Sequence, residues 1–187
     1  MRRTAELGLL LTLSLILSYV ESLIPFSFGI PGIKLGLPNL TVLLLIYDGT
    51  EKRSAGKDDV SRPLPVIFLK REEREAFLVN GLRIVLSGFL FGSLYAILYA
   101  LAGAVFSFAA MCLGRRAGCF SMVGVSVLGG VFHNIGQLLV AVAVVETPAV
   151  AYYAPFLIVA GTVTGALLGF TGTELLPYLR RIGREGE

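Results

Sequence analysis

The residues of this chain that could do chemistry are polar side chains set inside long apolar segments. Four elements each offer a polar stripe, and in three of them the residues recur three or four positions apart and so share one face of a helix. The fourth is Lys34, Asn39 and Thr41, from the segment at 25–34 and the helix that follows it. A charged side chain exposed to lipid is costly, so these stripes are expected to converge inside a bundle. The other three stripes are Ser14, Ser18 and Glu21, then Asn80, Arg83 and Ser87, then His133, Asn134 and Gln137.

The sequence leaves two interpretations of these stripes open. In the first, they line a site for a small polar or anionic solute toward the outer half of the membrane, with Lys34 and Arg83 as counter-charges. In the second, they form a satisfied network in which Glu21 pairs with Arg83 or Lys34 and locks the bundle. The candidate substrate-binding residues of the first interpretation are Glu21, Lys34, Asn39, Arg83, His133, Asn134 and Gln137.

His133 is the single histidine of the chain, and three roles are considered for it. It could be a hydrogen-bonded packing residue, a contact to the solute, or a group that binds a proton or a metal. Its helix supplies no Glu or Cys at metal-ligand spacing, and Cys112 and Cys119 have no His or Cys partners at such spacing. We therefore expect no metal and no cofactor, and two free thiols on the cytoplasmic side.

Motifs of soluble enzymes are missing from the sequence. It contains no P-loop, no dinucleotide-binding glycine pattern, no zinc motif and no Ser-His-Asp arrangement. Asp58 and Asp59 form an isolated acidic pair, whereas binding a diphosphate through Mg²⁺ usually needs several carboxylates. The sequence therefore argues against an enzyme. Its net charge of +3 is explained by membrane topology rather than by nucleic-acid binding.

The distribution of charge predicts the elements that position these residues. Of the 187 residues, 55% are hydrophobic and 16% charged, against about 25% charged in a typical soluble domain. The run 76–114 has one charge and would be about 58 Å long as one helix, so it must form two. We predict an all-α integral membrane protein, a single domain over 1–187, with about six transmembrane helices at 7–24, 35–47, 75–90, 93–113, 121–145 and 149–170.

Two parts of this predicted bundle are irregular. Residues 25–34 are apolar but rich in Gly and Pro, which predicts a re-entrant segment whose backbone is satisfied by protein. The helix at 35–47 is short and contains Pro38, which indicates a broken helix. Residues 48–75 hold seven basic and seven acidic side chains and are predicted to be a cytoplasmic loop within the domain.

The basic residues predict the orientation in the membrane. With six helices and a cytoplasmic N-terminus, fourteen of the 16 Lys and Arg residues fall on the cytoplasmic side. Cytoplasmic segments of membrane proteins carry this excess. We therefore expect a multi-pass protein of the plasma membrane with both termini in the cytoplasm.

Small residues recur every four positions on two of the predicted helices. This spacing lets helix backbones approach closely in lipid. It indicates either packing within the bundle or a docking face for a partner membrane subunit. The stripes are Ala96, Ala100 and Ala104 on one helix, and Gly161, Gly165 and Gly169 on another.

Four groups of motifs together resemble the Gx transporter family, which also carries the label heptaprenyl diphosphate synthase component I. The motifs lie at 18–25, at 31–39, at 80–83 with 88–93, and at 124–137. The resemblance covers nearly the whole chain. Residues 49–74 look like an insertion relative to the family.

That family is similar to the substrate-binding S components of energy-coupling-factor transporters. Those are six-helix membrane proteins that capture a vitamin or metal and work with a membrane scaffold subunit and a pair of ATPases. The resemblance implies a substrate-binding subunit of an uptake transporter. The family's other label implies an alternative, an accessory membrane subunit that partners a soluble prenyl synthase. The Asp-rich motifs of catalytic prenyl synthase subunits are missing from this sequence.

Overall fold

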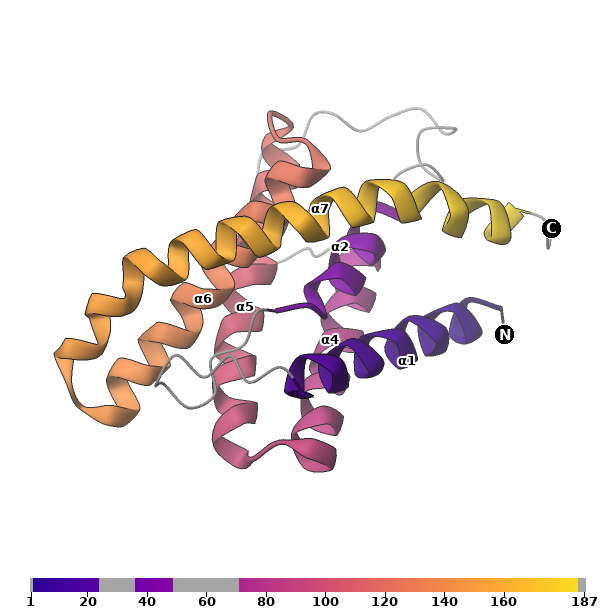
Figure 1. Ribbon diagram of the computed structural model, residues 1–187. Helices are drawn as coiled ribbons and strands as arrows, with labels where there is room; N and C mark the ends of the chain where they lie inside the picture. The colour runs from indigo at the N-terminus through magenta and orange to yellow at the C-terminus, as the bar shows by residue number, and fades with distance from the viewer. Residues whose placement is uncertain (1, 24–35, 49–70, 185–187) are drawn as a thin grey trace.

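The computed structural model describes residues 2–23, 36–48 and 71–184. These parts of the chain form helices joined by short turns, and no strand occurs in them (Figure 1). The elements are α1 (Arg2–Leu23), α2 (Asn39–Asp48), α4 (Arg71–Phe91), α5 (Leu94–Ala117), α6 (Met122–Val145), the short 3-10 helix η1 (Pro148–Tyr153) and α7 (Ala154–Arg184).

Within the described residues, four helical segments are long and apolar enough to cross a membrane: residues 4–23, 94–117, 122–145 and 149–179. The chain is therefore an all-α membrane protein, as the sequence predicted. Two helices differ from the spans expected at 35–47 and 75–90. α2 has ten residues and is about 15 Å long, half of the roughly 30 Å hydrocarbon core. α4 is longer, but its first five residues are all charged.

Polar and glycine caps explain the sharp turns on both sides of α5. Ser93 and Ser121 each accept a hydrogen bond through Oγ, at 3.2 Å, from the backbone N–H three residues further on. These bonds satisfy donors that the first helical turn leaves without partners. Gly118 ends α5 with a φ of 69° and donates to the Arg115 carbonyl, a left-handed conformation that costs glycine little.

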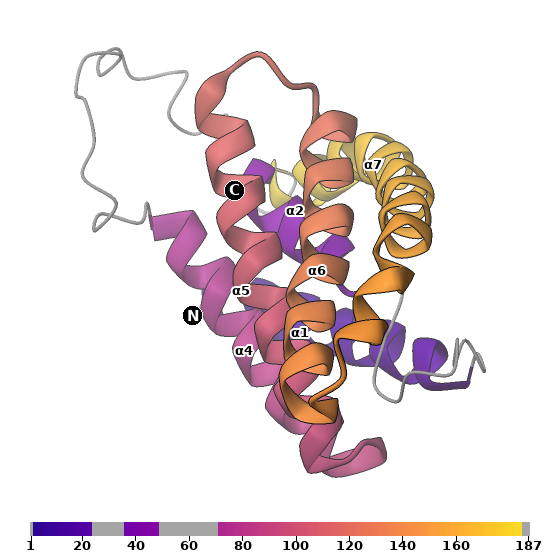
Figure 2. The same cartoon turned by 90° about the vertical axis from the view of Figure 1, so that its left-hand side faces the viewer.

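α2 occupies the centre of the bundle and packs against α1, α4, α5, α6 and α7. Its residues from Val42 to Ile46 are at most 2% exposed. A helix that is apolar on every side is stable only when other elements surround it. Figure 2 shows α4, α5 and α6 side by side in front of α2, with α7 beyond α6.

The glycine stripe on α7 is used inside the bundle. A Cβ at Gly161, Gly165 or Gly169 would lie 2.7 Å from backbone atoms of α6, too close for a side chain to fit. Only glycine lets the two backbones approach this closely. These three glycines therefore pack against α6, in keeping with the alternative of packing within the bundle, and a docking face for a partner subunit stays a prediction.

The alanine stripe on α5 also faces inward. Ala100 and Ala104 are buried in one cluster with Ile84 of α4, and Ala96 is half-buried at the start of α5. Small side chains at these positions let α4 and α5 lie close together. This stripe likewise contributes to packing within the chain rather than to an open docking face.

Two helix ends differ from the predicted boundaries. α4 begins at Arg71, within the predicted loop 48–75, and α7 continues to Arg184, well past the predicted end at 170. The extension of α7 is stabilised by Leu176 and Leu179, which pack on the core around α2. The predicted re-entrant segment 25–34 and most of the predicted loop lie outside the described residues.

Packing of α6 on α7 yields a first prediction. Gly165→Ala places a methyl group against the Ser126 carbonyl and should destabilise the protein by about 1–3 kcal/mol. Gly81→Ala is the matched control, because a Cβ there meets nothing within 4 Å and alanine favours helix by up to about 1 kcal/mol. Thermal unfolding in detergent measures the stability of both variants. An unfolding midpoint of Gly165→Ala equal to that of the wild type would contradict the close packing of α7 on α6.

Candidate functional site

The carboxylate of Glu21 holds the start of α2. Glu21 is 6% exposed, and its Oε1 accepts hydrogen bonds from the backbone N–H groups of Gly36 and Leu37. Gly36 has a φ of 81°, a left-handed conformation that lets the chain turn toward α2. Anionic groups are favoured at a helix start, where N–H groups and the helix dipole point at them. Glu21 therefore holds the turn that leads into α2.

His133 lies halfway along α6, between the turn that precedes α2 and the backbone of α5. A Cβ at Gly36 would lie 3.3 Å from His133 Cδ2 and 3.0 Å from Asn39 Nδ2. A Cβ at Gly103 would lie 2.9 Å from His133 Nδ1 and 3.0 Å from Gln137 Cγ. His133, Asn39 and Gln137 are all buried. The start of α2 therefore meets α5 and α6 at the middle of the bundle.

Arg83 of α4 reaches across to α1. Its Nη2 donates to Asn80 Oδ1 at 2.6 Å, and its Nη1 donates to Ser18 Oγ at 3.3 Å. Arg83 is 5% exposed, and its Nε has no hydrogen-bond partner. In the part of the chain that the structure describes, no carboxylate lies within ion-pair distance of Arg83, and Glu21 attracts it only from further away.

These contacts form one buried group, which we call the polar cluster. It brings together side chains from α1, α2, α4 and α6, where the sequence analysis expected the polar stripes to converge. Of the two pairings that the second interpretation allowed, the ion pair between Glu21 and Arg83 is not formed, and the pairing of Glu21 with Lys34 involves a residue outside the described part of the chain. The polar cluster consists of Ser18, Glu21, Asn39, Asn80, Arg83, His133 and Gln137.

Two of the candidate residues do not belong to the polar cluster as the structure describes it. Asn134 is buried, but its Nδ2 donates to the Leu157 carbonyl of α7 at 2.8 Å. It therefore ties α6 to α7, and its Oδ1 has no hydrogen-bond partner. Lys34 lies outside the described residues, so its role as a counter-charge stays a prediction.

A second buried charge lies at the other end of α4, near the turn between α5 and α6. Glu73 is 1% exposed, and its Oε2 accepts a hydrogen bond from Arg116 at 2.6 Å. The neighbouring Arg115 lies over the ring of Tyr47, at the end of α2, with its Cζ 5.3 Å from the ring centroid. We call Glu73, Arg115, Arg116 and Tyr47 the basic-end cluster, and it holds α2, α4 and α5 together.

Sequence reasoning missed Glu73, because residues 48–75 were assigned to a polar loop. A signal was nevertheless present. Glu73 precedes Asn80 by seven residues, which places it on the helix face that carries Arg83. The two cysteines are free, as predicted, with Cys112 buried and Cys119 exposed.

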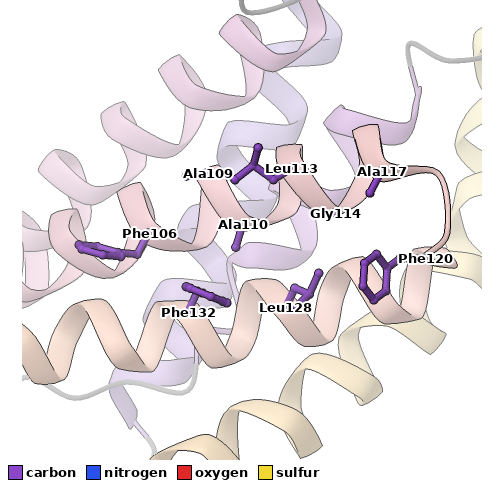
Figure 3. Close-up of a pocket in the computed structure, with 9 residues that line it drawn as sticks. All are labelled: Phe106, Ala109, Ala110, Leu113, Gly114, Ala117, Phe120, Leu128 and Phe132. Atoms are coloured by element: carbon purple, nitrogen blue, oxygen red, sulfur yellow. The ribbon is translucent and has the colours of Figure 1, made fainter. Parts of the chain in front are cut away.

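An apolar groove of about 410 Å³ lies on the outer surface between α5 and α6. Figure 3 shows its lining side chains on α5, on α6 and in the turn between them, and none of them is polar. The groove is lined by Phe106, Ala109, Ala110, Leu113, Gly114, Ala117, Phe120, Leu128 and Phe132.

The helices and the polar cluster define the class of this chain, an all-α membrane protein with charged side chains buried inside its bundle. The family model described as heptaprenyl diphosphate synthase component I matches residues 10–54 and 64–175. The chain therefore belongs to this family. The match is interrupted at 55–63, within the segment that looked like an insertion. No curated protein and no solved structure matches the chain.

The basic-end cluster yields a second prediction. Glu73→Gln leaves the Arg116 guanidinium without its carboxylate and should destabilise the protein by about 1–3 kcal/mol. The exposed pair of Arg71 and Glu75 offers the control, because Arg71 is 80% exposed and Arg71→Gln should change stability by less than about 1 kcal/mol. Denaturant unfolding in mixed micelles measures the free energy of unfolding of both variants. Equal losses of stability would show that the buried ion pair of Glu73 stabilises the protein no more than the exposed one.

Proposed function

We propose that this chain is the membrane-embedded solute-binding subunit of a small-molecule uptake transporter. The observation that carries the proposal is the pair of buried donors in the polar cluster that lack acceptors, Arg83 Nε and Asn39 Nδ2. Buried polar groups in proteins are nearly always hydrogen-bonded, and each exception calls for an explanation. A bound polar solute would supply the acceptors.

The cost of these donors argues for binding rather than for a purely structural network. A buried donor without a partner costs about 1–3 kcal/mol, and more when the group is charged. Both donors are on side chains that are otherwise held in place, Arg83 by Asn80 and Ser18, and Asn39 by its position in α2 beside Gly36. A site that is held ready in this way loses little conformational entropy when a solute binds.

The remaining parts of the proposal rest on the sequence. The chain has no nucleotide-binding motif, so the energy for transport would come from partner subunits, as in the transporters whose S components the family resembles. The distribution of Lys and Arg supports a plasma-membrane protein with both termini in the cytoplasm. The solute would then reach the polar cluster from the outer side, and Lys34 would add a further positive charge there.

The third prediction tests solute binding directly. The intact protein, purified in nanodiscs and analysed by mass spectrometry after denaturation, should release a small polar metabolite. Arg83→Ala should lower the amount released at least about tenfold, because it removes the buried donor. Arg116→Gln, which alters a buried charge in the basic-end cluster, should retain the metabolite. If the wild type releases no metabolite and uptake is unchanged on deletion of the gene, the proposal fails.

A second candidate function is supported by the description of the family. Under it, the chain would be an accessory membrane subunit of a prenyl diphosphate synthase, and a soluble Asp-rich subunit would perform the catalysis. The apolar surface of the bundle, including the groove between α5 and α6, is the part that could contact a prenyl chain.

The fourth prediction separates the two candidate functions. If the accessory function holds, deleting the gene should shorten or deplete the isoprenoid side chains of the quinones, which lipid extraction and mass spectrometry measure. The same strain complemented with Arg83→Ala should recover normal quinones, because Arg83 lies in the polar cluster and not on the apolar surface. Unaltered quinones in the deletion strain would reject the accessory function.

A further inference from the structure

The charge of Glu21 is already balanced within the protein. Its carboxylate accepts the N–H groups of Gly36 and Leu37, directly ahead of α2. The start of a helix carries a partial charge of about +0.5, which favours an anion there. Discontinuous helices that begin near the middle of a membrane commonly place this positive end at a transport site. Glu21 is therefore a positioning residue for α2 rather than a counter-ion available to a solute.

The charge of Arg83 is not balanced in this way. Both of its hydrogen-bond partners, Asn80 Oδ1 and Ser18 Oγ, are neutral acceptors. They fix the orientation of the guanidinium but leave its positive charge without a carboxylate at contact distance. A buried guanidinium of this kind is matched best by an oxyanion, whose two oxygens complement its fork of donors.

Two buried hydrogen-bond donors of the polar cluster that have no acceptor also favour an anionic ligand. Arg83 Nε and Asn39 Nδ2 are both donors, and both residues are at least nine-tenths buried. A chain of contacts joins them. Arg83 binds Ser18, which lies one turn before Glu21 on α1, and Glu21 binds Gly36, which packs on Asn39. Both donors therefore belong to the polar cluster, and a ligand that accepts hydrogen bonds would satisfy them.

We infer that the solute carries a carboxylate, bound by Arg83 Nε and Asn39 Nδ2, while Glu21 holds the helix that presents Asn39. This inference rests on the proposed binding function and specifies the class of its solute. A primary amine in place of the carboxylate would meet Arg83 as a like charge at close range, which disfavours its binding. An amide of the same shape lacks the charge that the guanidinium selects.

The experiment uses the full chain in nanodiscs and a panel of two- to six-carbon hydroxy-, keto- and amino-carboxylates, each paired with its primary amide. Thermal stability is recorded at millimolar concentrations of each compound, and dissociation constants are then measured for those that stabilise the protein. At least one carboxylate should raise the unfolding temperature, and its amide should bind at least about tenfold more weakly.

Two conservative variants locate the effect, and a third serves as the control. Asn39→Asp replaces the donor with a carboxylate of the same shape, and Arg83→Lys keeps the charge but removes Nε. Each should weaken binding of the carboxylate at least about tenfold. Arg116→Gln should leave the affinity unchanged. Asp has the same shape as Asn, and both are favoured at helix starts, so the Asn39→Asp variant is expected to fold.

The outcomes separate this inference from the proposed function. If one or more of the primary amides bind and no carboxylate does, the site binds solutes but the carboxylate assignment is wrong. If a carboxylate binds equally to the wild type and to Asn39→Asp, the assignment to this site is wrong. If no compound binds and no metabolite is released from the wild type, the binding function and the carboxylate inference both fail.

Discussion

The hydrogen bonds from the Gly36 and Leu37 N–H groups to the Glu21 carboxylate shape the rest of the bundle. Where water is excluded, a helix cannot begin unless protein groups accept its first N–H groups. The first N–H groups of α2 donate to the carbonyls of residues 36–38, and Glu21 of α1 in turn accepts the N–H groups of Gly36 and Leu37, so the turn from which α2 starts is satisfied at the middle of the bundle. Because α2 is enclosed on every side, its residues from Val42 to Ile46 can all be apolar.

α4 shows how this arrangement accommodates charge. Its buried face includes two charged residues, Glu73 and Arg83, among polar and apolar ones, whereas its exposed face carries large apolar side chains such as Leu78 and Phe89. This is the reverse of a helix on a soluble protein, and it suits a helix whose outer face contacts hydrocarbon. The two charges are handled differently. Glu73 has a dedicated ion pair with Arg116, whereas Arg83 is held only by neutral acceptors.

The two candidate functions depend on different parts of the same bundle. Binding a small solute requires the polar cluster at the level where α2 begins. An accessory role in prenyl diphosphate synthesis requires the outer surface, where the groove between α5 and α6 offers only apolar contacts. Family membership is compatible with either use, because the family description concerns a component of a synthase and this chain lacks the Asp-rich motifs of a catalytic subunit. The proposal of solute binding rests on the buried donors of Arg83 and Asn39 that have no acceptor.

The sequence by itself determined that this is an all-α membrane protein whose polar stripes point inward. That much is readable because hydrocarbon penalises charge and unpaired backbone so strongly that few other arrangements remain.

The sequence did not reveal the partners of the polar residues. Glu21 binds backbone N–H groups and Asn134 binds a backbone carbonyl, and such groups leave no trace in residue type. Glu73 and Arg116 are 43 positions apart, so only the packing of α4 on α5 brings them together. The tertiary structure likewise decided that the glycines of α7 pack on α6, because a stripe of small residues is the same whether its partner lies in this chain or another.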